Sequence, residues 1–171
     1  MKVKDIIYED FVNYFKPSMF IIMPTCSFKC DNECGRPVCQ NSALAAAPTI
    51  EINNEEIIEN FYKNPISEAI CIGGLEPFDT FEELFTFLIE YKNYGIKNKK
   101  LAYDIVIYTG YEPNEIQDKL KALKELSLPI IIKFGRFIPD SNSVYDAVLG
   151  VELASENQWA ARLSNLKLEE N

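Results

Sequence analysis

Four short runs of apolar, mostly β-branched residues recur along the chain, and they constrain its fold more than any other feature. They occupy residues 19–23, 69–74, 103–110 and 129–135. The runs are continuous rather than alternating, which is typical of strands covered on both faces, as in parallel sheets. A fifth run at residues 147–152 is a weaker strand candidate.

Longer amphipathic segments separate these runs. Residues 53–64, 79–95 and 112–126 carry apolar residues at helical spacing. We expect Asn54 to cap the first of these helices and the second to end near Gly95. The order strand, helix, strand, helix predicts an α/β fold, a mainly parallel sheet with crossover helices.

The length of 171 residues fits a single domain, 1–171, with its core at about 18–158. We expect residues 1–17 and 159–171 to be appendages. The chain has 26 acidic and 17 basic residues and no dense basic stripe, so no nucleic acid partner is expected. Without a signal peptide or an apolar run of about 20 residues, we expect no membrane association and a cytoplasmic location.

Cysteine is the residue type most suited to chemistry in this chain, which contains no histidine. Four of the five cysteines, Cys26, Cys30, Cys34 and Cys39, lie within fourteen residues that directly follow the first predicted strand. This place is the carboxyl end of a parallel sheet, where α/β folds bind ligands. The spacing differs from the paired C-x2-C of zinc knuckles and favours an iron–sulfur cluster. Zinc, and redox or structural thiols, remain alternatives.

A second candidate wall of the same pocket follows the second predicted strand, in the stretch "GGLEP". The pair Gly73 and Gly74 would let a ligand approach the backbone, and the Glu76 carboxylate follows two residues later. Taken alone, the stretch is more typical of a tight turn between a strand and a helix.

Together these two segments resemble the radical S-adenosylmethionine enzymes, whose signature is C-x3-C-x2-C followed later by Gly-Gly-Glu-Pro. Within that superfamily the chain is most similar to the small activating proteins of anaerobic ribonucleotide reductase. The stretches "IYTGY" at 107–111, "KFGRFIPD" at 133–140 and "SENQ" at 155–158 carry further likeness. The resemblance implies a short partial (β/α) barrel of the radical S-adenosylmethionine type.

The resemblance also implies an activity. A [4Fe–4S] cluster would reductively cleave S-adenosylmethionine to a 5′-deoxyadenosyl radical, which would generate a glycyl radical on a large anaerobic (class III) ribonucleotide reductase. A flavodoxin- or ferredoxin-type protein would donate the electron. No catalytic residue is expected beyond the cluster and cofactor. The alternatives are a radical enzyme acting on another protein or peptide, and a non-catalytic iron–sulfur or zinc-binding module.

The ligand set implied by the resemblance needs one choice, because Glu33 stands where the signature has its third cysteine. The family's third cysteine is typically followed after one residue by asparagine, and Cys39 with Asn41 fits this pattern. We therefore expect Cys26, Cys30 and Cys39 to hold the cluster, with Cys34 as the competing third ligand. The residues expected to bind the cofactor are Phe28, Asn41, Gly73, Gly74, Glu76 and Thr109.

Overall fold

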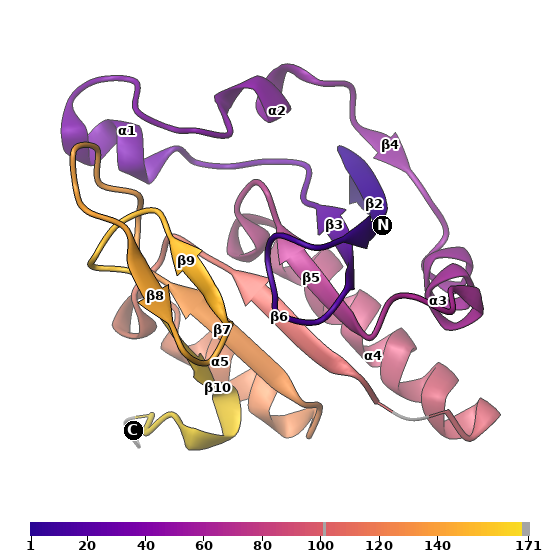
Figure 1. The fold of residues 1–171 in the computed structure, drawn as a ribbon. Helices are drawn as coiled ribbons and strands as arrows, with labels where there is room; N and C mark the ends of the chain where they lie inside the picture. The colour runs from indigo at the N-terminus through magenta and orange to yellow at the C-terminus, as the bar shows by residue number, and fades with distance from the viewer. Residues whose placement is uncertain (101, 169–171) are drawn as a thin grey trace.

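Four parallel strands form the centre of the main sheet in the computed structural model, which describes residues 1–100 and 102–168 (Figure 1). They are β3 (Ser18–Ile22), β5 (Ala69–Gly73), β6 (Asp104–Tyr108) and β7 (Ile130–Phe134), which lie side by side in this order. Each falls within one of the four apolar runs or extends it by one residue. The prediction of a mainly parallel sheet is therefore confirmed.

Both terminal segments, expected to be appendages, complete this sheet at its edges. β2 (Asp5–Asp10) pairs antiparallel with β3, and β10 (Trp159–Arg162) pairs antiparallel with β7. The result is an open six-stranded sheet of order β10-β7-β6-β5-β3-β2, and no closed barrel is present among the described residues.

The remaining strands form two small ribbons. β1 (Lys2–Val3) pairs with β4 (Ile50–Glu51), and β8 (Val144–Asp146) forms a hairpin with β9 (Val151–Leu153). The fifth predicted strand, residues 147–152, was therefore wrong in its bounds, since most of it is the turn of this hairpin. The carboxylate of Asp146 accepts hydrogen bonds from the backbone N–H groups of Val148 and Leu149, and Gly150 has the positive φ of 70° that the turn requires.

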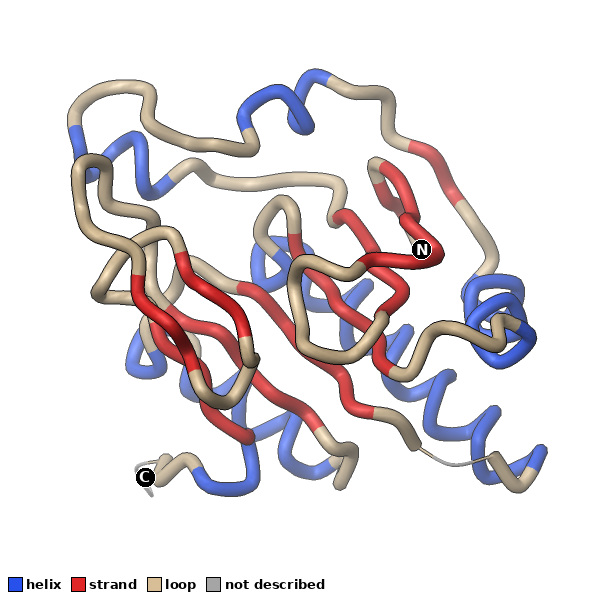
Figure 2. The backbone as a smooth tube through the Cα atoms, in the orientation of Figure 1, coloured by secondary structure: helices blue, strands red, loops and turns tan. Residues whose placement is uncertain are grey.

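The helices that cross between the parallel strands all lie on one face of the sheet (Figures 1 and 2). They are α3 (Asn54–Lys63), α4 (Phe81–Asn98) and α5 (Gln117–Glu125), with the short 3-10 turns η1 (Pro77–Thr80) and η2 (Pro113–Glu115) before the last two. This placement follows from the strand order, because successive right-handed crossovers that always advance in one direction stay on one side.

Two helix ends differ from expectation. The cap of α3 is Asn53 rather than Asn54, since its side chain accepts the hydrogen bond from the N–H of Glu55 at 2.8 Å. α4 continues past Gly95 to Asn98 and ends where Lys99 takes a left-handed conformation. None of the described helices combines the length and the hydropathy that a membrane span requires.

The two faces of the sheet are covered differently. On one face, isoleucines of the parallel strands pack against the apolar sides of α3, α4 and α5. On the other face, a smaller cluster that includes Tyr14, Cys71, Leu149 and Leu153 packs under the β8–β9 hairpin and the loop between β2 and β3. Cys71 is fully buried there. This second face carries none of the helices α3, α4 and α5, which leaves room for a cavity.

Candidate functional site

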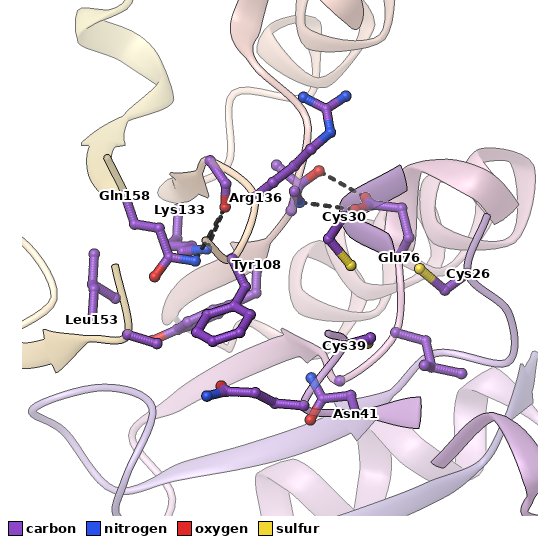
Figure 3. A pocket seen from close by; sticks show the side chains of 18 of the residues that line it. Cys26, Cys30, Cys39, Asn41, Glu76, Tyr108, Lys133, Arg136, Leu153 and Gln158 are labelled. Atoms are coloured by element: carbon purple, nitrogen blue, oxygen red, sulfur yellow. Dashed lines mark hydrogen bonds between the residues drawn. The ribbon is translucent and has the colours of Figure 1, made fainter. Parts of the chain in front are cut away.

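A cavity of about 470 Å³ opens at the carboxyl ends of the parallel strands, on the face that the helices leave free (Figure 3). Its walls come from the segment after β3, the turn after β5, the ends of β6 and β7, strand β9 and the loop between β2 and β3. The volume is in the usual range of small-molecule sites, and the position is where parallel α/β sheets bind ligands.

Three of the four clustered cysteines line this cavity, and the fourth does not. Cys26, Cys30 and Cys39 are half-buried in its wall, whereas Cys34 is exposed and outside it. Cys30 and Cys39 are neighbours, close enough that Cys39 raises the pKa of the Cys30 thiol. Among the described residues, no three cysteine or carboxylate side chains are gathered closely enough to enclose a single metal ion.

Burial favours the protonated form of the Cys26 and Cys30 thiols. It raises the pKa of Cys26 to about 11 and the pKa of Cys30 to about 12, with the neighbouring Cys39 and Asp31 adding to the effect on Cys30. Three thiolates together in this wall therefore need a cation among them to offset their desolvation and mutual repulsion.

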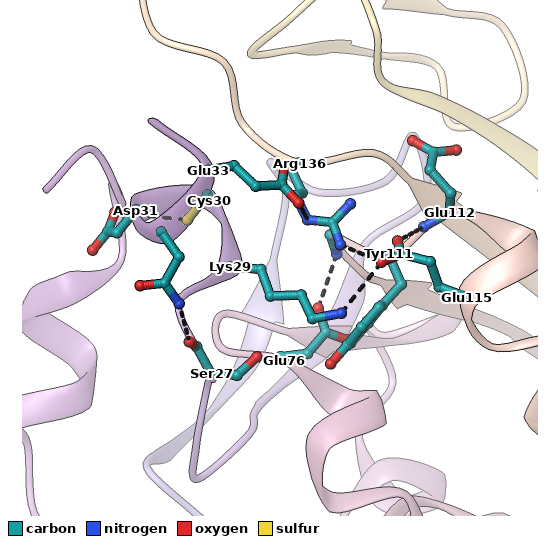
Figure 4. A network of polar contacts seen from close by, with 12 residues as sticks. Ser27, Lys29, Cys30, Asp31, Glu33, Glu76, Tyr111, Glu112, Glu115 and Arg136 are labelled. Carbon is teal, nitrogen blue, oxygen red and sulfur yellow. Dashed lines mark hydrogen bonds and ion pairs between the residues drawn. The ribbon is translucent and has the colours of Figure 1, made fainter. Parts of the chain in front are cut away.

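The cysteine segment contains two short helices, α1 (Lys29–Cys34) and α2 (Ser42–Ala46). α1 begins after Phe28, which has a left-handed φ of 53°, and ends at Gly35, which has a φ of 64°. Charged side chains tie α1 to the strand ends (Figure 4). Lys29 is 3.2 Å from the Glu115 carboxylate, and its ammonium lies over the Tyr111 ring at 4.3 Å.

Arg136, just beyond β7, is the centre of these ion pairs. Its guanidinium contacts Glu115 at 2.5 Å and Glu33 of α1 at 3.1 Å. The hydrogen bond from Arg136 lowers the pKa of Glu115 to about 2. Sequence reasoning missed this network because its members come from segments far apart in the chain, and none of them belongs to a local motif.

Glu76 joins the ends of β5 and β6 inside the cavity wall. Its carboxylate accepts hydrogen bonds from the Thr109 hydroxyl at 2.7 Å and from the N–H groups of Gly110 at 2.9 Å and Phe78 at 3.1 Å. Burial raises the pKa of Glu76 to about 7, although these hydrogen bonds oppose the rise. A carboxylate has about four acceptor positions, so one remains for a ligand.

The glycine pair is required by packing within the chain. A Cβ at Gly74 would lie 2.7 Å from the Ile22 side chain, and a Cβ at Gly73 would lie 2.8 Å from the Tyr108 side chain. Gly74 lines the cavity; Gly73 does not, and its carbonyl already accepts hydrogen bonds from the N–H groups of Met23 and Leu75.

Among the other residues expected to bind the cofactor, Asn41 and Thr109 also line the cavity, whereas Phe28 does not. Sequence reasoning missed Lys133, which β7 places in the wall across from the cysteines, beside Gln158 (Figure 3). Lys133 is only 6% exposed, and its ammonium donates a hydrogen bond to the Gly135 carbonyl at 2.8 Å. Burial lowers its pKa to about 8. The sequence does contain a signal for this residue, since Lys133 is the one charged residue in an otherwise apolar strand.

The family of this chain is shown by comparison with protein-family models. The model described as a 4Fe-4S single cluster domain matches residues 18–150, more than three quarters of the chain. The chain therefore belongs to this family, and a [4Fe–4S] cluster domain is compatible with an enzyme of the radical S-adenosylmethionine type. Neither the curated proteins nor the solved structures include a match.

The residues in the cavity wall fit such a cluster. Thiolates are the ligands that iron–sulfur clusters take, and three cysteines from one segment line this cavity. Because Cys26 and Cys30 are partly buried, their thiolate forms need a cationic partner. The same cavity continues past the cysteines to Glu76 and Lys133. It therefore offers a thiol-rich end and a polar end to a group bound between them.

Proposed function

We propose that this chain is a radical S-adenosylmethionine enzyme of the activating class, which generates a glycyl radical on an anaerobic ribonucleotide reductase. The observation that carries the proposal is the shared cavity. It joins Cys26, Cys30 and Cys39 to the turn that contains Gly74 and Glu76, and it excludes Cys34. Three protein ligands would leave one iron of a [4Fe–4S] cluster open, as catalytic metal sites keep an open position.

When bound, the cluster would supply one electron that cleaves the sulfonium of S-adenosylmethionine, and the resulting 5′-deoxyadenosyl radical would take a hydrogen atom from a glycine of the partner. The chain itself positions the reactants. The free acceptor position on Glu76 suits the ammonium group of the methionine moiety, and the buried Lys133 ammonium suits a carboxylate. The apolar side chains of Phe20, Leu44 and Leu153 exclude water around them.

The electron donor and the protein substrate belong to the same proposal. A flavodoxin- or ferredoxin-type protein would reduce the cluster, and a glycine-containing segment of the large reductase would reach the cavity. In the alternative, a different protein or peptide accepts the radical. That alternative predicts the same cleavage of S-adenosylmethionine without a glycyl radical on the reductase.

The test is anaerobic reconstitution of the purified chain with iron and sulfide, followed by reduction and measurement of 5′-deoxyadenosine. We expect about four irons per chain and cleavage of S-adenosylmethionine. Cys39→Ser should lower iron affinity by more than the roughly 10–100-fold typical of changes around a metal ligand, and should abolish cleavage.

Cys34→Ser is the matched control, since it changes a cysteine of the same segment that lies outside the cavity. We expect it to retain iron and cleavage. Full activity in Cys39→Ser would refute the ligand assignment, and one bound zinc with no cleavage would refute the enzyme proposal.

A further inference from the structure

The ten residues from Cys30 to Cys39 contain an exposed excursion that takes no part in the cavity. Residues 32–37 are all exposed, and they include the end of α1 and the turn at Gly35. Cys34 lies within this excursion. The chain nevertheless returns so closely that Cys39 raises the pKa of the Cys30 thiol and its backbone N–H donates to the neighbouring Asp31 carboxylate.

The side chain of Asp31 closes the excursion. One oxygen of its carboxylate, Oδ1, accepts hydrogen bonds from the backbone N–H groups of Val38 and Cys39, both at 2.8 Å. The same oxygen lies 3.8 Å from the Cys30 sulfur, whose thiol donates to it. A single atom thus binds the outgoing part of the segment at the Cys30 thiol and the returning part at the backbone of Cys39.

This arrangement is charge-assisted and specific. Hydrogen bonds from N–H groups to a carboxylate are about twice as strong as those between neutral groups. Gly35 ends α1 with a φ of 64° and turns the chain. The two hydrogen bonds to the Asp31 carboxylate then hold the returning backbone at Val38 and Cys39.

We propose that Asp31 is a positioning residue that brings Cys39 to Cys30 across the excursion, so that cysteines separated by eight residues occupy neighbouring places in one site. The proposal rests on the proposed set of ligands, Cys26, Cys30 and Cys39. Asp31 acts through the backbone of Cys39 and is not itself a ligand. Cys34 stays outside the cavity as a consequence of this closure.

The first test uses the metal-free protein and does not depend on the cluster. Mild oxidation with diamide, which takes up the two hydrogens of a thiol pair, should form a Cys30–Cys39 disulfide that peptide mass spectrometry identifies. In Asp31→Ala this disulfide should form about tenfold more slowly, because two hydrogen bonds to the returning backbone are lost together. Asp31→Asn keeps an oxygen acceptor at the same place and should restore the rate.

The matched control is Asp140→Ala, which removes an exposed carboxylate that pairs with Arg36 of the same excursion at 3.4 Å. It should leave the disulfide rate unchanged. Equal rates in Asp31→Ala and the wild type would overturn the proposal. A rate lowered equally by Asp140→Ala would also overturn it, because the effect would then be general loosening of the excursion.

The second test uses the reconstituted protein and reads its iron content and the electron paramagnetic resonance spectrum of the reduced state. Asp31→Ala should lose iron, whereas Asp31→Asn should retain the iron content and line shape of the wild type. If the wild type binds no iron–sulfur cluster, the proposed function fails while the disulfide test still decides the role of Asp31. If Asp31→Ala keeps the wild-type spectrum, the positioning role fails and the proposed function stands.

Discussion

At the scale of single residues, partly buried carboxylates join segments that lie far apart in the chain. Asp104 on β6 accepts hydrogen bonds from the Tyr14 hydroxyl at 3.0 Å and the Lys16 ammonium at 2.7 Å, and it pairs with Arg162 at 3.3 Å. Burial alone would raise the pKa of Asp104, but these donors outweigh it and hold the pKa below its usual range. The ionised form of Asp104 therefore stabilises the folded chain.

This network predicts sensitivity to acid. The pKa of Asp104 is lower in the folded state than in the unfolded chain, so its contribution is fully present above the unfolded value near 3.9 and is lost as the pH falls through the folded value. Asp104→Asn should lower the free energy of unfolding at pH 7 by about 1–3 kcal/mol and should flatten its fall below pH 4.

Urea unfolding followed by circular dichroism at several pH values measures both effects. Glu90→Gln, an exposed change on α4, is the control and should leave the curve within about 0.5 kcal/mol of the wild type. If the free energy of unfolding fell equally steeply with acid in Asp104→Asn and in the wild type, another carboxylate would be responsible for the loss of stability.

At the scale of elements, the sequence predicted the parallel strands within two residues at each end, because their burial on both faces leaves a local apolar pattern. The edge strands β2 and β10 could not be predicted in this way, since their residues become strands through pairing with β3 and β7. The local apolar pattern was misleading at residues 147–152, where the Asp146 carboxylate and Gly150 form a turn instead of a strand.

The end of β5 yields a prediction at this scale. Gly74→Ala would place a Cβ 2.7 Å from Ile22 at a residue whose φ is 75°, so both sterics and backbone strain oppose it. We expect the free energy of unfolding to fall by about 2–5 kcal/mol, the sum of about 1–2 kcal/mol for a left-handed alanine and about 1–3 kcal/mol for a local overlap. Gly35→Ala is a matched control, because its φ is 64° but no atom lies within 4 Å of the new Cβ.

Gly35→Ala should therefore lower the free energy of unfolding by about 1–2 kcal/mol, the penalty of placing an alanine in the left-handed conformation. The comparison is made by thermal and chemical unfolding of the two variants beside the wild type. If both variants lost the same free energy of unfolding, the Ile22 side chain would have moved to make room for the new Cβ, and packing would not require glycine at position 74.

At the scale of the whole molecule, the sheet carries all its crossover helices on one face and its cavity on the other. The cysteine segment and the "GGLEP" turn could be assigned to one pocket from sequence, because both follow parallel strands. Sequence could not predict the ion pairs of Glu115 with Lys29 and Arg136, because these residues come from distant segments that meet only in the fold. It could not predict the hydrogen bonds of Asp31 either, because they depend on the path of the loop. The partial barrel stays a prediction within the proposed function.

Because β2 and β10 pair with central strands, we expect them to unfold with the rest of the sheet. Trp159, the single tryptophan of the chain, lies on β10 with its ring 4.8 Å from that of Phe134. The unfolding midpoint from tryptophan fluorescence should therefore coincide with that from far-ultraviolet circular dichroism, as in two-state unfolding. Trp159→Phe supplies the fluorescence baseline. An earlier fluorescence transition would mean that β10 frays independently.

The exposed excursion between Cys30 and Cys39 has a consequence for recognising such sites. A sequence motif fixes the number of residues between cysteines, whereas a cluster requires only that the sulfurs lie at the right distances in space. Through its hydrogen bonds to Val38 and Cys39, the Asp31 carboxylate would allow the second requirement to be met without the first. The number of residues in the excursion could then differ without moving the three ligands. A reporter group attached to the exposed Cys34 would sense changes at the site without occupying it.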